Sequence, residues 1–445
     1  MSPTPSSLIA LNRFGLGARP GDAALVGADA KAWLRGQIAP PPALPVYDGL
    51  PPGGISVAKL VSQGQSAAEI AKEAERLARE QGRELYAREM AARLAAQLES
   101  PAPFIERMTA FWSNHFTVSI QRPTLLGVVG AFEREAIRPN VVGRFADLLR
   151  AAESHPAMLL YLDNAQSIGP NSPVGRRINR GLNENLAREI LELHSLGVDG
   201  GYSQADVRAL AGVLTGWSIG RADEPSPGQF MFRARAQEPG PQTLLGVVYD
   251  GDGKQRADRA LGDLARHPRT IQRLSAKLAA HVTRDDPPAA LVARLTAVWT
   301  GSDGDLAAVY AALIDAPECW DPAPRKLKTP HEFALSTWRL LQDRSPPKDR
   351  LASLGALGQP SFAAPSPAGW SDREADWLGP EALMRRIEWA HHQATLAAPR
   401  SDPFQTMTAA FGDAPPPALR QAVGRAASGA DALTLILSSP SFMRR

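Results

Sequence analysis

The sequence has almost no cysteine and no long apolar run. Cys319 is the single cysteine among 445 residues, so an intrachain disulfide and a metal cluster of several cysteines from one chain are both excluded. No apolar stretch reaches the roughly 18 residues that a membrane span requires, and the first residues lack the basic and apolar segments of a secretory signal. We therefore expect no transmembrane segment and, for the chain as written, a cytoplasmic location. The location would be periplasmic if a leader had been removed or the chain were exported with a partner.

The sequence also has no marked excess of positive or negative charge. The 49 Lys and Arg residues nearly balance the 46 Asp and Glu residues, for a formal charge of +3. No dense basic block, zinc-finger pattern or glycine-rich phosphate loop is present, so no nucleic-acid partner is expected. The sequence also has no Gly-x-Ser-x-Gly or His-Glu-x-x-His motif, and we assign no cofactor and no metal ligand.

The apolar residues that are present follow helical spacing over most of the chain. This pattern predicts a mainly α fold, a single large multi-helix domain with lobes and one small β-hairpin insertion. Residues 1–60 are expected to form short helices and a proline-rich connector, and residues 61–100 one long charged helix. Residues 101–445 would form the motif-bearing helical core, with the hairpin at about 229–250 and an aromatic loop at 355–379.

The densest polar motif lies in a predicted helix over residues 183–196. Asn183 is expected to be its N-cap and Gly197 its C-terminal stop. One face of this helix is apolar, and the opposite face carries Glu184, Asn185, Arg188, Glu189 and Glu192. Spacing of four residues predicts the ion pairs Glu184–Arg188 and Arg188–Glu192. If this face of the helix meets water, the ion pairs belong to an ordinary solvated surface. If it meets a cleft, one carboxylate would act as a general acid or base whose pKa is tuned by Arg188.

Two histidines lie on otherwise apolar helix faces. His194 follows the polar motif, and His115 shares a helix side with Phe111 and Trp112. Each fits either a hydrogen-bonded core residue or the wall of a ligand pocket. With Asp163 and Glu189 they would suffice for a metal site, although no metal-specific spacing is present.

Further aromatic and polar residues mark helix ends and loops. Tyr202 precedes Ser203 and Asp206, which are spaced as a capping box, and Trp217 follows the predicted helix. In the 355–379 loop, the rings of Phe362, Trp370 and Trp377 fit sugar stacking or a plug onto the core equally well.

Taken together, these motifs resemble the bacterial family catalogued as domain of unknown function 1800. The matching segments span nearly the whole chain. They are Leu11-Asn-Arg-Phe-Gly-Leu-Gly, Phe111-Trp-Ser-Asn-His-Phe, Ala157-Met-Leu-Leu-Tyr-Leu-Asp-Asn, the 183–197 motif, Tyr202-Ser-Gln-Ala-Asp-Val, Thr215-Gly-Trp, Lys328-Thr-Pro-His-Glu-Phe, Gly358-Gln-Pro, Pro365 through Trp370, and Ser438-Ser-Pro-Ser-Phe.

The resemblance implies a mainly helical protein with no assigned reaction, often exported. It also implies a gene neighbour of the family domain of unknown function 1501, which is similar to sulfatases. The chain departs from the family's usual pattern at His194 and Ser195. It also has a basic segment, Arg176-Arg-Ile-Asn-Arg, whose role the sequence does not explain. The family's signature residues correspond to Asn114, His115, Asp163, Asn164, Asn183, Glu184, Asn185, Arg188, Glu189, Glu192, Gly197, Tyr202, Asp206, Trp217 and Trp370.

The leading hypothesis is an acid/base hydrolase-type enzyme acting on a carbohydrate or cell-envelope polymer. Glu184 and Glu189 would be its acid/base groups, with Asp163 as a further carboxylate and Arg188 and His115 as tuning groups. These groups are expected to meet in one water-accessible hollow. The alternatives are a non-catalytic helical scaffold or co-export partner of the sulfatase-like protein, and a metal- or haem-binding oxidoreductase. The expected substrate-binding residues are Trp112, Asn114, Asn183, Asn185, Tyr202, Trp217 and Trp370.

Overall fold

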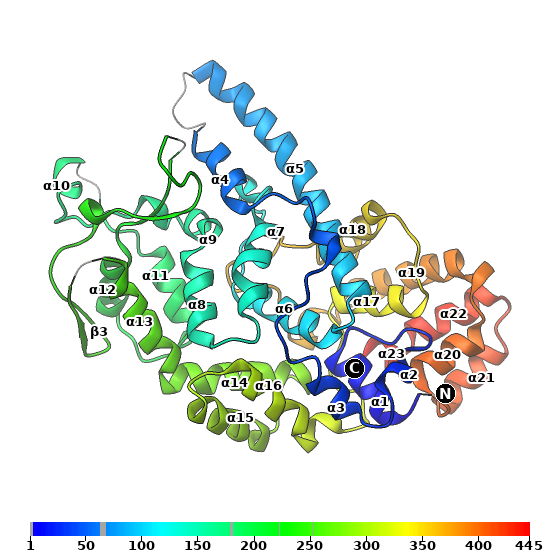
Figure 1. Ribbon diagram of the computed structural model, residues 1–445. Helices are drawn as coiled ribbons and strands as arrows, with labels where there is room; N and C mark the ends of the chain where they lie inside the picture. Colours follow the sequence, from blue (N-terminus) through cyan, green and yellow to red (C-terminus); the bar gives the residue numbers. More distant parts are fainter. Residues whose placement is uncertain (1–2, 63–67, 179–180, 222, 252) are drawn as a thin grey trace.

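The computed structural model describes residues 3–62, 68–178, 181–221, 223–251 and 253–445, and most of them form helices (Figure 1). This confirms the predicted mainly α class. In these ranges no helix combines the length and apolarity needed to cross a membrane. The N- and C-terminal ends of the chain lie near each other, beside α1 and α23 (Figure 1).

Two apolar cores divide the helices into two lobes. The core of the first lobe consists of residues between Ala10 and Cys319, whereas the core of the second consists of residues between Leu327 and Met443 together with Leu16, Leu94 and Leu98. The helices before the second lobe are α1 (Pro5–Ile9), α2 (Asp22–Val26), α3 (Ala30–Arg35), α4 (Gly53–Ser62), α5 (Ala68–Glu99), α6 (Pro103–His115), α7 (Val129–Phe132), α8 (Phe145–Ser154), α9 (Pro156–Tyr161), α10 (Gly175–Ile178), α11 (Asn185–Glu189), α12 (Gln204–Leu214), α13 (Lys254–Arg266), α14 (Pro268–Val282), α15 (Ala289–Gly301) and α16 (Leu306–Asp315).

The second lobe is a helical bundle, and the end of α5 packs against it. Its helices are α17 (Pro330–Leu340), α18 (Pro347–Ala356), α19 (Pro380–Ala397), α20 (Pro403–Phe411), α21 (Pro417–Gly424), α22 (Gly429–Ser438) and α23 (Pro440–Met443). Proline at the first helical position begins most of them, because its fixed φ suits that position and its missing N–H has no partner there. Residues 63–67, at the start of the predicted 61–100 segment, lie outside the described residues.

The strands pair differently from the single predicted hairpin. β1 (Trp217–Ile219) pairs antiparallel with β2 (Phe230–Phe232), and β3 (Gln242–Leu244) pairs with β4 (Val247–Tyr249). The second pair turns on Leu245 and Gly246, which both have positive φ, as a two-residue turn between strands requires. Leucine rarely adopts this conformation, and here the Asp206 carboxylate accepts the Leu245 N–H at 2.6 Å. Within the predicted 229–250 segment a hairpin therefore spans residues 242–249, whereas Phe230–Phe232 pairs with β1, which lies outside that segment.

The predicted 183–196 helix is α11 followed by a π-helical turn, η8 (Ile190–His194). The N-cap residue is Glu184 and not Asn183 as predicted. The Asn183 side chain still accepts a hydrogen bond at the helix start, from the Asn185 N–H to its Oδ1 at 2.9 Å. Gly197 stops the helix at φ +98° as expected. The capping box of Ser203 and Asp206 at the start of α12 is also confirmed.

Candidate functional site

A cavity of about 100 Å³ lies where the two lobes meet. The first lobe contributes residues of α6 and the end of α14, and the second contributes the start of α17 and the 359–372 segment. Its polar lining residues are Arg93, Arg107, Ser113, Asn114, Thr117, His281, Thr329, His331, Glu332, Gln359, Ser361, Ser371 and Asp372, with Phe111, Phe362 and Trp370 as aromatic walls.

The aromatic loop is fixed to the C-terminal end of α6. The Asn114 side chain donates to the Trp370 carbonyl and accepts the Trp370 N–H, both at 2.8 Å. Gly369 precedes this contact with φ +82°, and a Cβ there would lie 2.4 Å from the Asn114 carbonyl oxygen. Only glycine permits this approach. The loop therefore closes one side of the cavity through backbone contacts that side-chain pattern alone does not reveal.

Glu332 forms the most enclosed ion-pair cluster of the cavity wall. Its Oε1 accepts from Arg107 and lies 2.9 Å from Nη2 of Arg445, and its Oε2 accepts the Thr329 N–H at 3.0 Å. Burial alone would raise the pKa of this carboxyl, but Arg445 and Arg107 outweigh it and hold the pKa well below its usual range. Glu332 is therefore an anion at neutral pH.

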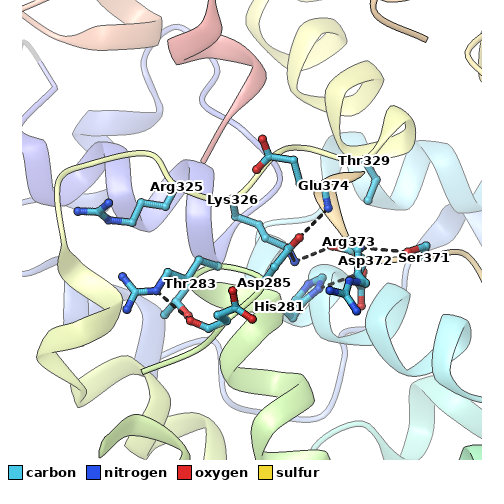
Figure 2. A network of polar contacts seen from close by, with 12 residues as sticks. His281, Thr283, Asp285, Arg325, Lys326, Thr329, Ser371, Asp372, Arg373 and Glu374 are labelled. Atoms are coloured by element: carbon cyan, nitrogen blue, oxygen red, sulfur yellow. Dashed lines mark hydrogen bonds and ion pairs between the residues drawn. The ribbon is translucent and has the colours of Figure 1, made fainter. Parts of the chain in front are cut away.

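His281 and Asp372 face each other across the cavity edge (Figure 2). His281 Nδ1 lies 3.8 Å from Asp372 Oδ1, and His281 Nε2 lies 3.5 Å from Arg107 Nη1. Burial lowers the pKa of His281 to about 4. Burial of Asp372 works in the opposite direction, but His281, Lys277 and Lys326 lower the pKa of its carboxyl to about 2. The pair is therefore a neutral imidazole beside a carboxylate.

Lys326 holds the segment that carries Asp372. Its Nζ donates to Asp285 Oδ1 at 2.7 Å and to the Asp372 carbonyl at 2.6 Å, and Asp285 Oδ2 accepts the Glu374 N–H at 2.8 Å (Figure 2). This network ties the end of α14 to the residues before the short helix η11 (Glu374–Asp376). The position of the Asp372 carboxylate is thus set from both lobes.

A second neutral histidine, His331, lines the same cavity. Gln359 Oε1 accepts its backbone N–H at 2.8 Å, and its Nε2 lies 3.5 Å from Arg93 Nη1. Burial, followed by Arg93 and Arg107, lowers the pKa of His331 to about 3. Arg93 is itself held by Glu133, to which its Nε donates at 2.8 Å.

Two lysines beside the cavity also have lowered pKa values. Burial lowers the pKa of Lys277 to about 8 and that of Lys328 to about 7. Lys277 Nζ lies 3.2 Å from His115 Nδ1, and Lys328 Nζ lies 3.9 Å from the centre of the Phe442 ring. Groups that titrate near neutral pH are the ones that can give and take protons during a reaction.

Of the predicted site residues, Asn114 and Trp370 line this cavity. Trp112, His115 and Trp217 lie in the core instead. Trp112 Nε1 donates to the Tyr310 hydroxyl at 2.6 Å, and His115 Nε2 lies 3.2 Å from the His194 carbonyl. These three side chains have no access to solvent, so direct contact with a substrate requires the core to open.

His194 is also sealed in the core. Its Nδ1 lies 2.7 Å from Glu153 Oε1, and both side chains are completely buried. The contact joins the π-helical turn η8 to α8. Burial, followed by Lys277, lowers the pKa of the neighbouring His115 far below its usual value.

The polar face of α11 lies on the surface. Arg188 bridges Glu184 at 3.2 Å and Glu192 at 3.6 Å, as the spacing predicted, and Gln204 and Arg208 also bind Glu184. The Gln204 hydrogen bond and the two arginines lower the pKa of Glu184. In this network Glu184 is a stable carboxylate on an exposed helix start.

The other predicted residues lie near this surface. Glu189 is half-buried, and burial raises the pKa of its carboxyl. Burial, followed by Glu192, raises the pKa of Tyr202 to about 12. Asn185 is the first residue of α11. Asp163 pairs with Arg122 at 2.7 Å at the edge of a separate groove, and the Asn183 side chain donates to the Asp163 carbonyl at 3.3 Å. The catalytic roles assigned to these residues stay predictions.

Sequence reasoning missed Arg107, His281, His331, Glu332 and Asp372 as site residues. One signal was present, because Lys328-Thr-Pro-His-Glu-Phe is among the family-like motifs, yet its Thr and Glu are spaced as a capping box and indicate only a helix start. His281 and Asp372 belong to no motif that we recognised. In the described ranges no three His, Cys, Asp or Glu side chains are grouped as a metal site requires.

A family model described as "Protein of unknown function (DUF1800)" matches residues 9–444, nearly the whole chain. Comparison with curated proteins and with solved structures gives no match. The match confirms the resemblance inferred from the motifs and adds no reaction, substrate or partner.

Proposed function

The chain belongs to the DUF1800 family, and from the interlobe cavity we propose that it is a hydrolase-type acid/base enzyme. The observation that carries the proposal is the His281–Asp372 pair beside Arg107. Asp372 favours the His281 tautomer with its proton on Nδ1, and Nε2 is then the proton acceptor. The imidazole is neutral at pH 7, so Nε2 carries a lone pair, and with a pKa of about 4 it would depend on the Asp372 carboxylate to stabilise the imidazolium that forms when it takes a proton. The 3.8 Å separation of the pair would shorten when a substrate fills the cavity.

The arginines of the cavity support the same chemistry. Arg93 and Arg107 present guanidinium groups to a partly enclosed cavity, where fixed positive charge stabilises a negative transition state more strongly than it does in bulk water. Each arginine keeps a carboxylate partner, Glu133 and Glu332 respectively, so both stay oriented in the absence of substrate.

The mouth of the cavity suits a carbohydrate. Trp370 and Trp377 stand with ring centres 6.0 Å apart, and both rings are partly exposed. Aromatic faces beside polar groups are a usual platform for sugar rings. A cavity of about 100 Å³ accepts the reacting end of a chain rather than a long segment, so we propose a carbohydrate or cell-envelope polymer attacked at an exposed or terminal unit.

The test is a turnover screen with purified envelope polysaccharides and chromogenic glycosides, read by release of new reducing ends. We expect at least one substrate for the wild-type chain and a loss of at least about 100-fold in His281→Asn, because general-base catalysis contributes about that much or more. Glu381→Gln, at an exposed glutamate that pairs with Arg385, is the matched surface control and should retain activity. If Glu189→Gln abolishes turnover and His281→Asn does not, the acid/base group lies on α11, as the motif suggested.

A second candidate function rests on the buried contacts of the central motif. Trp112, His115 and His194 are sealed and bonded to Tyr310, Lys277 and Glu153, which is the arrangement of an architectural element. On this reading the chain is a scaffold or co-export partner of a sulfatase-like protein of the DUF1501 family. Co-expression followed by size-exclusion chromatography tests it; a sulfatase-like protein that elutes separately would count against it. The oxidoreductase alternative is tested by metal analysis and an absorption spectrum.

A further inference from the structure

A second, larger hollow lies on the first lobe, away from the acid/base cavity. It has a volume of about 950 Å³ and lies between the end of α9, α10 and the β1–β2 pair. We call it the arginine groove, because its charged lining residues are Arg122, Arg177, Arg221, Arg233 and Arg235, with Asp163 as the lining carboxylate.

Two of these arginines are committed to the protein itself. Arg122 pairs with Asp163 and donates to the Tyr161 carbonyl at 2.7 Å. Arg233 pairs with Glu224 at 2.8 Å and donates to the Ile219 carbonyl at 2.9 Å. They build the groove walls and neutralise the two carboxylates.

The other three arginines lack such partners. In the described part of the chain, Arg177, Arg221 and Arg235 are exposed, and their side chains form no hydrogen bond or ion pair, although the charge of Arg221 helps to lower the pKa of Glu224. Arg177 and Arg235 lie on walls that are tied together, because Val174 N–H donates to the Arg235 carbonyl at 3.2 Å. Three guanidinium groups around one hollow repel each other unless an anion lies between them.

The lining between the charges is mostly apolar, with Thr124, Gln166, Ser167 and Ser218 as its uncharged polar residues. Ile168, Val174, Ile219, Met231 and Phe232 all line the groove, and Phe232 is its single aromatic residue. Guanidinium groups match carboxylates and phosphates in pairs of hydrogen bonds, and aliphatic side chains accommodate the carbon face of a sugar ring. A single-stranded nucleic acid would require several stacking rings, which this lining does not supply.

We propose that the arginine groove binds an acidic polysaccharide, a chain whose sugar or polyol units carry carboxylate or phosphate groups. The inference deepens the proposed function by naming the class of polymer, and it rests on that function for the role of the bound chain as substrate. It also gives a role to Arg177 of the basic segment that begins at Arg176; Asn179 and Arg180 of that segment lie outside the described residues.

The groove and the acid/base cavity share one segment of chain. Thr117 and Val118 line the cavity, and Arg122 lines the groove, so residues 117–122 connect them over at most roughly 20 Å. This segment also contacts the cavity loop, since Ile120 N–H donates to the Phe362 carbonyl at 2.8 Å and Ser119 Oγ to the Ala364 carbonyl at 2.7 Å. The groove and the cavity are thus joined through this segment, and a polymer that occupies both must extend beyond the groove.

The test is calorimetric titration of the full chain with four ligands: oligogalacturonate, poly(glycerol phosphate), neutral dextran and single-stranded DNA. We expect one or both acidic glycans to bind and dextran not to bind, with affinity falling as salt screens the charges. Binding of the first glycan identifies carboxylate recognition, and binding of the second identifies phosphate recognition. The triple variant Arg177→Ala, Arg221→Ala, Arg235→Ala should bind at least about tenfold more weakly, because it lacks three charge-assisted contacts.

The control has the same change of charge on another surface. Arg400→Ala, Arg420→Ala and Arg425→Ala remove three exposed arginines of the second lobe and should leave the affinity unchanged. Absence of acidic-glycan binding at low salt, an equal loss in both triple variants, or tighter binding of DNA would overturn the proposal. His281→Asn should bind normally. If the wild-type chain binds an acidic glycan but turns over none of the screened substrates, the acid/base function is rejected and the binding proposal stands.

Discussion

The buried carboxylate of Glu332 offers the sharpest test of the interlobe cavity. We predict that Glu332→Gln strongly destabilises the protein, although the amide has the same shape. Glutamine can take the place of glutamate in a capping box, so the start of α17 keeps its hydrogen bonds to Thr329. What the substitution removes is the negative charge between Arg107 and Arg445.

The expected magnitude follows from the burial of those two arginines. Their side chains are 4% and 1% exposed, and Glu332 is 10% exposed, so water cannot replace the lost partner. Removing one member of a buried ion pair costs about 3–5 kcal/mol, because the remaining charge stays desolvated. With an unfolding entropy of about 2.1 cal/mol/K per residue over 445 residues, this lowers Tm by roughly 3–5 °C.

The assay is thermal and urea unfolding of wild type, Glu332→Gln and the matched control Glu381→Gln. Glu381 also binds an arginine, Arg385, but its side chain is 82% exposed, so its change should cost less than about 0.5 kcal/mol. The folded-state pKa of Glu332 is depressed, so its contribution is present above the unfolded pKa and lost as pH falls further. The difference in free energy of unfolding between wild type and Glu332→Gln should therefore become smaller at acid pH. Equal stability of the two glutamine variants at pH 7 would refute the reasoning.

Three further predictions concern the same interface. His281 and His331 have pKa values of about 4 and about 3 in the folded protein, below the usual 6.5, so the unfolded chain binds more protons and the free energy of unfolding should fall as pH drops from 6.5 toward 3. In urea titrations His331→Gln should flatten this pH dependence, and an unchanged slope would contradict the prediction. Gly369→Ala places a Cβ 2.4 Å from a backbone oxygen at positive φ and should cost at least about 2 kcal/mol, whereas Gly355→Ala, in open space within α18, should gain about 0.5–1 kcal/mol; equal Tm values for the two would be the contrary result. Lys277 has a pKa of about 8 instead of 10.5, so wild-type stability relative to Lys277→Met should rise between pH 8 and 10.5, and parallel pH curves would show that the amine is not buried.

Part of the candidate site could be anticipated from sequence. The Asn114 and Trp370 positions stood out as polar or aromatic residues in family-like motifs, and both line the cavity. The ion pairs of Arg188 were also predicted, because spacing along a helix fixes neighbours on its surface. Spacing could not decide whether that face meets water or a cleft, and its surroundings place it at the surface.

The remaining site residues could not be anticipated because their partners are distant in sequence. Arg107, His281, Glu332 and Arg445 each follow a local pattern that indicates only a helix or a chain end. Their meeting depends on how α6, α14 and α17 pack between two lobes. Periodicity reports which face of a helix is buried but not which other helix covers it.

The sequence by itself determined the mainly helical class, the capping boxes and the membership in the DUF1800 family, because these depend on residues near each other along the chain. Tertiary structure alone decided the strand pairing, the sealing of His115 and His194, the cavity between the lobes and the arginine groove. Each of these arises from contacts between distant segments. There burial and neighbouring charges set the protonation and exposure of side chains that local sequence leaves open.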